Sequence, residues 1–235
     1  MHSLRPVSIQ RHFTKTTPGS VLYRCGDTVV LCTASLEDRV PDWMVGRGKG
    51  WITAEYNMLP GSTSPRKSRE RSGKVDGRTT EIQRLIGRSF RAVADLSKLG
   101  ERSLTIDCDV LQADGGTRTA AITGGFIALV DAVNTVFQDA TLDAYPLRAS
   151  VAAISVGIVD GAPTLDLDYA RDVKADVDMN VVMTGGGRFI ELQGTGEEAT
   201  FDDAELASLI QLAKQGIREL TQIQKETLGA GWKFS

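Results

Sequence analysis

Alternating apolar and polar positions in the first sixty residues predict β-strands. Residues 7–13 alternate in this way, as expected for a strand with one buried face. Similar β-rich runs follow at 20–24, 28–33 and 50–56. Gly26 and Asp27 separate two of these runs and favour a tight hairpin turn. This part of the chain is therefore expected to form a sheet.

Helical spacing begins after a polar segment, 61–77, which has the composition of a loop. Apolar residues then recur every three or four positions, at Ile82, Leu85, Ile86, Phe90 and Val93. Thr80 followed by Gln83 has the form of a capping box, which predicts the start of a helix. A strand predicted at 103–111 leads into a second, apolar helix at about 120–137.

The second half repeats the order of strands followed by a helix. Strands are predicted at 151–159, 163–169, 180–183 and 188–193. Asp202 and Glu205 form a capping box at the start of a long amphipathic helix. The apolar stripe of this helix comprises Leu206, Leu209, Ile210, Ala213, Ile217, Leu220 and Ile223. Residues 229–235 are expected to form a frayed tail.

Strand clusters followed by helices predict an α+β fold. No linker divides the 235 residues, so we expect one domain, 1–235, with room for an internal structural duplication. The hydrophobic share of 41% and the charged share of 24% are ordinary for a globular protein. A chain of this length buries roughly three-quarters of its unfolded surface and needs no disulfides to fold.

Charge and composition exclude several classes of protein. The net charge is −3, whereas a simple nucleic-acid-binding domain is usually basic, so any RNA surface must be local or created by assembly. The two histidines lie in no triad-like or zinc-ligand context. The three cysteines lack metal-ligand spacing and are expected to be buried in a reducing compartment. With no signal peptide and no membrane span evident, we expect a cytoplasmic protein.

The segment from Asp114 to Thr119 is a candidate anion site. It lies between a predicted strand end and a predicted helix start, and Gly115 and Gly116 let the backbone turn sharply. The first N–H groups of a helix lack internal partners and attract anions. Thr117 adds a hydroxyl, and Arg118 adds a fork that matches phosphate oxygens. A plain glycine turn with a surface arginine remains the alternative.

Carboxylates gather between residues 166 and 178, at Asp166, Asp168, Asp172, Asp176 and Asp178. A magnesium site needs one or two carboxylates together with water and substrate phosphate, and phosphoryl chemistry uses such an ion to neutralise charge. The spacing does not select the ligands, and a solvated acidic loop remains the alternative.

Basic residues are concentrated between 61 and 78, at Arg66, Lys67, Arg69, Arg71, Lys74 and Arg78. On the predicted helix that follows, Arg84, Arg88 and Arg91 fall on one face, which is expected to be the solvent side. Such a patch suits backbone phosphates of a nucleic acid rather than base edges. A solvated, salt-bridged loop remains the alternative.

The combination and order of these motifs resemble the bacterial ribonuclease PH family over nearly the whole chain. The resemblance rests on LRPVSI at 4–9, GSVLYRCGDTVVLCTASLED at 19–38, KGWITAEYNMLP at 49–60, GRTTEIQRLIGRSFRA at 77–92, DCDVLQADGGTRTAAITGG at 107–125, DVDMNVVMT at 176–184 and ELQGTGEEATF at 191–201. QADGGTRT and the GRT-EIQRLI helix start are highly specific in combination.

The resemblance implies a ribonuclease PH core fold of two related β-α modules, assembled into hexameric rings that are trimers of dimers. It implies phosphate-dependent 3′→5′ trimming of tRNA precursors beyond the CCA end, with release of nucleoside diphosphates, and a reverse reaction that adds nucleotides. Inorganic phosphate is then a co-substrate and Mg²⁺ the expected metal.

Family roles carry over to the positions that match each motif. The resemblance assigns phosphate binding to Arg78, Gly116, Thr117 and Arg118, catalysis and metal binding to Asp172 and Asp178, and RNA contacts to Arg66, Arg69 and Arg84. Two other functions remain open at this point: a non-catalytic RNA-binding ring subunit, and a hydrolytic metal-dependent nuclease.

Overall fold

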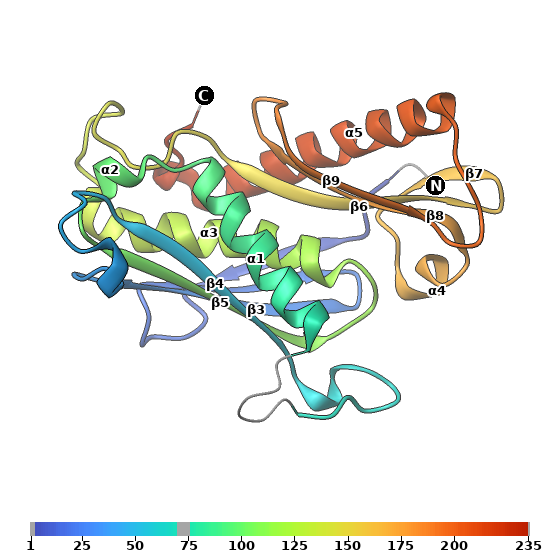
Figure 1. Ribbon diagram of the computed structural model, residues 1–235, viewed down its shortest axis with the longest axis horizontal. Helices are drawn as coiled ribbons and strands as arrows, with labels where there is room; N and C mark the ends of the chain where they lie inside the picture. The colour runs from blue at the N-terminus through green and yellow to red at the C-terminus, as the bar shows by residue number, and fades with distance from the viewer. Residues whose placement is uncertain (1–2, 70–75, 235) are drawn as a thin grey trace.

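The computed structural model describes residues 3–69 and 76–234, which form four alternating layers of sheet and helix (Figure 1). A five-stranded sheet has the order β1-β2-β3-β5-β4, and a four-stranded sheet has the order β7-β6-β8-β9. Helices α1 and α3 lie between the sheets, and α5 covers the outer face of the smaller sheet. The predicted α+β class is confirmed.

The larger sheet is antiparallel except for one parallel pair, β4 with β5. Its strands are β1 Val7–Arg11, β2 Gly19–Cys25, β3 Thr28–Glu37, β4 Trp51–Met58 and β5 Ser103–Gln112. Buried and less buried residues alternate along β5, so one face of the strand packs on helix α3 Thr117–Phe137. Helix α1 Gly77–Ala92 packs on the neighbouring strand β4. All three cysteines are buried and free, as predicted.

The smaller sheet is sandwiched between two helices. Its strands are β6 Val151–Val159, β7 Ala162–Leu165, β8 Ala175–Thr184 and β9 Phe189–Gly196, and its outer helix is α5 Asp203–Leu228. We call the larger sheet with α1 and α3 the first module, and the smaller sheet with α5 the second module. Strand β6 is buried almost throughout because α3 packs on one of its faces and α5 on the other. Its apolar sequence therefore does not alternate.

Helix α3 is long and apolar enough to cross a membrane by length and composition, but 78% of its most apolar window is buried inside the protein. It contacts strands of both sheets, which explains why apolar residues surround it on every side. The remaining short elements are α2 Leu96–Leu99, α4 Tyr169–Asp172 and the 3-10 turns Asp42–Met44, Pro60–Ser62 and Gly229–Gly231.

Several predicted helix boundaries are wrong. Helix α1 begins at Gly77, because the side chain of Asp76 accepts from the N–H of Arg78 and caps it one turn before Thr80. Helix α3 begins at Thr117 rather than near residue 120. The capping box of α5, Asp202 with Glu205, is confirmed.

The strand predicted at 163–169 is also too long. Strand β7 ends at Leu165, and the side chain of Asp168 accepts from the N–H of Arg171 to cap α4. The polar residues that follow Leu165 favour capping and turning over sheet pairing, since aspartate side chains compete for backbone N–H groups.

The tail predicted to be frayed is packed over its described residues, 229–234. Phe234 is 9% exposed, and its ring lies 5.5 Å from that of Phe126 in α3. The indole of Trp232 donates to the carbonyl of Phe234 at 2.6 Å. Lys233 donates to the carbonyl of Phe137 at the end of α3. The tail lacks helical periodicity, but its aromatic side chains find the first module's core.

Candidate active site

The predicted anion site is a glycine turn between β5 and α3. Gly115 and Gly116 have φ values of 73° and 65°, which lie in the left-handed region that favours glycine. A Cβ atom at Gly115 would lie 2.5 Å from the carbonyl oxygen of Leu167, so the turn packs directly against the second module. Gly116 is the N-cap of α3 and offers no side chain to the first-turn N–H groups. These donors suit an anion.

The hydroxyl of Thr117 is oriented by a buried tyrosine. The hydroxyl of Tyr56 donates to Thr117 Oγ1 at 2.8 Å, and both residues are buried. Burial raises the pKa of Tyr56, so the phenol stays protonated and acts as a donor at neutral pH. With its oxygen already accepting, the Thr117 hydroxyl is left to donate its own proton. The alternation along β4 points Tyr56 inward, but its role is not visible in the sequence.

Arg118 is held by a polar network from three elements. Its Nη1 donates to Gln193 Oε1 in β9 at 3.0 Å and lies 3.4 Å from Glu81 Oε1 in α1. Gln193 donates in turn to Glu81 and to Glu191, both at 3.1 Å. Arg88 on α1 pairs with Glu191 at 2.8 Å. Every one of these bonds to Arg118 uses Nη1, on one side of the guanidinium fork.

Asp172 and Asp178 lie close enough to interact. The pKa of Asp172 is raised by partial desolvation and by the negative charge of Asp178, while the charges of Arg78, Arg118 and Arg5 act in the opposite direction. The fold therefore brings both predicted acids and both predicted phosphate-binding arginines into one electrostatic neighbourhood. A carboxylate whose pKa is raised by a neighbouring negative charge is the condition that a bound cation relieves.

Two of the other carboxylates of the acidic segment, Asp166 and Asp168, have structural roles. Asp166 is buried in an ion pair with Arg5, and Asp168 caps α4 and pairs with Arg171. Within residues 3–69 and 76–234, no group of three or more His, Cys, Asp or Glu side chains is placed to hold a metal. A pair of carboxylates with water and substrate phosphate still suits Mg²⁺. The residues that fit this ion are Asp172 and Asp178.

The predicted RNA-contacting residues Arg66, Arg69 and Arg84 are all exposed. Arg66 and Arg69 lie in the segment that precedes α1, and Arg84 lies on α1 itself. Arg71 and Lys74, which also contributed to the predicted basic patch, fall outside the described residues.

The predicted solvent face of three arginines on α1 is wrong for Arg91. Its guanidinium lies 4.6 Å from the ring centroid of Trp51 and donates to the carbonyl of Ile52 at 2.7 Å. Arg91 therefore fastens α1 to β4. A seven-residue offset leaves it within about 20° of the face of Arg84, but its long side chain reaches Trp51 and Ile52 in β4. Arg88 is exposed but engaged with Glu191.

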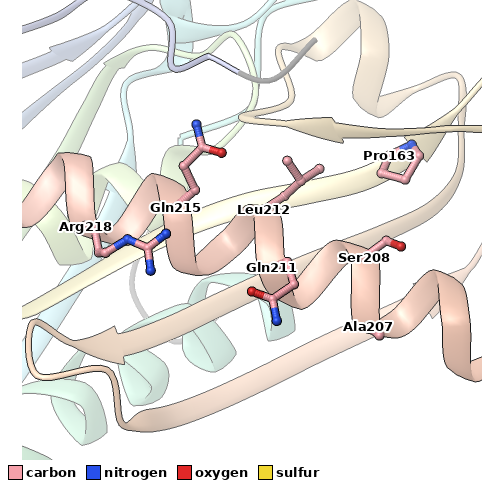
Figure 2. A pocket seen from close by; sticks show the side chains of 7 residues that line it. All are labelled: Pro163, Ala207, Ser208, Gln211, Leu212, Gln215 and Arg218. Carbon is pink, nitrogen blue, oxygen red and sulfur yellow. The ribbon is translucent and has the colours of Figure 1, made fainter.

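A separate open groove of about 610 Å³ lies on the outer helix (Figure 2). Its lining comprises Pro163, Ala207, Ser208, Gln211, Leu212, Gln215 and Arg218. These residues come from β7 and α5, and none belongs to the anion site or the acid pair. The groove is thus unrelated to the candidate active site.

Comparison with known proteins places the chain in a family. Residues 3–134 match domain 1 of the 3′ exoribonuclease family, and residues 149–216 match domain 2. The two matches correspond to the two β-α modules described above. A curated relative, Ribonuclease PH of Rhodopirellula baltica, is 67% identical over 230 residues, which cover 96% of this chain and 94% of the relative.

Solved structures share the fold at low identity. Rice (Oryza sativa) Rrp46 superposes with a TM-score of 0.77 at 20% identity, covering 97% of this chain and 96% of the other. The Archaeoglobus fulgidus exosome with RNA bound to its active site gives a TM-score of 0.77 at 19% identity, covering 94% of this chain and 89% of the other. Both confirm the predicted ribonuclease PH fold.

Proposed function

The chain belongs to the 3′ exoribonuclease family that includes ribonuclease PH, and from this we propose that its glycine turn and acid pair carry out phosphorolysis of RNA. The activity is that of a phosphate-dependent exoribonuclease, also called a tRNA nucleotidyltransferase. The observation that carries the assignment of roles is the electrostatic coupling of Asp172 to Asp178, Arg78 and Arg118.

Inorganic phosphate binds at the start of α3 in this proposal. The N–H of Gly116, the hydroxyl of Thr117 and the guanidinium groups of Arg78 and Arg118 orient it. Tyr56 supports this role because it leaves the proton of Thr117 available. Arg118 supports it because its bonds within the protein occupy Nη1, and the rest of the fork can face the anion.

The reaction is an in-line displacement at the last phosphodiester. An oxygen of inorganic phosphate forms a bond to the terminal phosphorus, and the bond from that phosphorus to the 3′ oxygen of the preceding nucleotide breaks. The terminal nucleotide leaves as a nucleoside diphosphate, and the shortened RNA keeps a 3′ hydroxyl. Positioning and charge stabilisation supply most of the rate, as in other phosphoryl transfers.

Asp172 and Asp178 would hold Mg²⁺, which supplies shielding of the charge on the attacking and leaving oxygens. Asp178 is half-buried in β8, opposite Thr195 of β9. The leaving 3′ oxygen gains a proton, and in this proposal Asp178 assists that transfer.

The substrate we propose is the 3′ end of tRNA precursors beyond CCA, gripped through backbone phosphates by Arg66, Arg69 and Arg84. A hexameric ring, built as a trimer of dimers, would gather these basic patches around its central opening. We propose that this ring acts in the cytoplasm. Local positive potential could then steer RNA despite the net charge of −3. Light scattering tests this part of the proposal, since a monomer would contradict it.

One assay tests the reaction itself. A 3′-extended tRNA is incubated with magnesium, with and without inorganic phosphate, and the released nucleotides are identified. Nucleoside diphosphates that appear only with phosphate are expected. Monophosphates without phosphate would instead indicate hydrolysis, and no products would indicate a binding subunit.

Arg118→Ala tests the proposed phosphate site and should lower the rate of phosphorolysis. Removing one charged hydrogen bond costs roughly 1.5–3 kcal/mol, or on the order of 10–100-fold in rate. Arg39→Ala is the control, because the side chain of Arg39 is 81% exposed and pairs only with Glu37 among the ion pairs of the described chain. Equal turnover by the two variants would contradict the assigned phosphate site.

A further inference from the structure

A buried ion pair joins the N-terminal strand region to the acidic segment. Arg5 donates from Nε to Asp166 Oδ2 at 3.1 Å and from Nη2 to Asp166 Oδ1 at 2.8 Å, and its backbone N–H donates to Oδ2 at 2.9 Å. The two side chains are 12% and 3% exposed. Burying such a pair carries a large desolvation cost and is weak evidence for stability alone. A positional role explains it better.

The same arginine reaches the turn that holds the anion site. Its Nη1 donates to the carbonyl of Asp114 at 2.5 Å and lies 3.8 Å from the carboxylate of that residue. The Asp114 carboxylate also accepts from the N–H of Tyr169, at 3.3 Å, in the acidic segment. On the other side of the turn, Thr28 donates to the carbonyl of Gly115 at 2.7 Å. The turn is thus fixed from both modules.

Asp166 fixes the start of the segment that carries Asp172. It has a φ of 57°, which is uncommon for a residue other than glycine and persists where the surroundings determine it. Its N–H donates to the carbonyl of Ser155 at 2.8 Å, and its carboxylate accepts from the thiol of Cys25 at 3.3 Å. Asp172 follows six residues later, at the end of α4.

We infer that Arg5, with Asp114 and Asp166, is a positioning lock that sets the distance between the bound phosphate and the acid pair. Arg5 donates in two directions at once, to the phosphate turn and to the acidic segment. Lysine keeps the charge but lacks the planar fork, so it cannot hold both partners in this geometry. The inference rests on the proposed phosphorolysis.

The test compares Arg5→Lys with a second, partly buried arginine whose fork is bound in the same way. Arg11 donates from Nε and Nη2 to Asp131 at 3.0 and 2.6 Å and from Nη1 to the carbonyl of Thr227 at 3.0 Å. These partners lie away from the phosphate turn, on the C-terminal half of α3 and at the end of α5. Arg11→Lys therefore loses a comparable set of bonds to a buried aspartate without touching the site.

We expect both lysine variants to lower Tm, and only Arg5→Lys to impair the reaction. The phosphate-binding groups remain, and only their position relative to the acid pair changes. The kcat of Arg5→Lys should therefore fall at least about tenfold, while its KM for phosphate changes less than about threefold. Arg11→Lys should keep kcat within about twofold at a temperature well below Tm. Equal kcat for the two variants would overturn the lock.

Asp166→Asn is the second variant if Arg5→Lys does not fold. It keeps the size of the side chain and one acceptor oxygen, and it should lower kcat in the same way. A wild-type kcat for Asp166→Asn would overturn the inference, whatever the result for Arg5→Lys. The wild-type product assay keeps the two proposals apart: without phosphate-dependent diphosphate release the proposed function fails, whereas an active wild type with an unaffected Asp166→Asn refutes only the lock.

Discussion

The polar network around Arg118 predicts unequal effects for its two partners. Gln193→Leu removes the acceptor of the 3.0 Å bond from Arg118 and the bonds that Gln193 donates to Glu81 and Glu191. Glu81→Gln keeps an acceptor at nearly the same place but removes the ion pair. The first change should impair phosphate use strongly, and the second only slightly.

The exposure of each group sets the magnitude. Arg118 is 19% exposed, so its bond to Gln193 falls at the lower end of a charged hydrogen bond, about 1.5 kcal/mol or about tenfold. Glu81 is 51% exposed and lies 3.4 Å from Arg118. A pair of this kind is worth about 0.5 kcal/mol, or about twofold.

The assay is kcat/KM for inorganic phosphate, measured from diphosphate release at saturating RNA. Gln222→Leu is the matched control, because Gln222 donates only to Glu226 on the exposed face of α5 among the bonds of the described residues. It should leave kcat/KM unchanged. A loss from Glu81→Gln as large as that from Gln193→Leu would refute the argument that exposure decides between these partners.

Four further outcomes are expected. Asp178→Asn should lower the pKa of Asp172, which carboxyl NMR measures. Because folding raises the pKa of Asp172, Asp172→Asn should raise Tm at pH 7. This gain in Tm should vanish as the pH falls below the ordinary aspartate pKa. Phe234→Ala should lower the free energy of unfolding by roughly 3 kcal/mol and Tm by roughly 6–12 °C in calorimetry. An unchanged Tm would indicate that the tail is frayed, as the sequence predicted. Gly115→Ala should abolish the rise in Tm that inorganic phosphate gives by binding the folded protein. Gly61→Ala should keep this rise, because Gly61 has open space around it.

Local chemistry made the glycine turn of the candidate anion site predictable from the sequence. Glycines before a helix, followed by threonine and arginine, specify donors whatever the rest of the chain does. Asp172 and Asp178 were harder, since five carboxylates share the segment and spacing alone treats them alike. Only the fold assigns Asp166 to an ion pair and Asp168 to a helix cap.

Long-range contacts account for what the sequence could not predict. Arg5 and Asp166 are 161 positions apart, and neither has a neighbour that suggests the other. The place of Gln193 beside Arg118 depends equally on how the modules meet. The tail was misjudged because a periodic pattern detects amphipathic helices but not single aromatic residues that fill a distant core.

The packing of the tail also has a consequence for how the protein is made. The first module is synthesised first, yet the ring of Phe126 in its central helix is covered by Phe234. Until residue 234 has left the ribosome, the helix that begins at the glycine turn has an exposed aromatic surface and lacks the contact of Lys233 with its last turn. A stalled or shortened chain that lacks these residues therefore presents an apolar surface to chaperones and proteases.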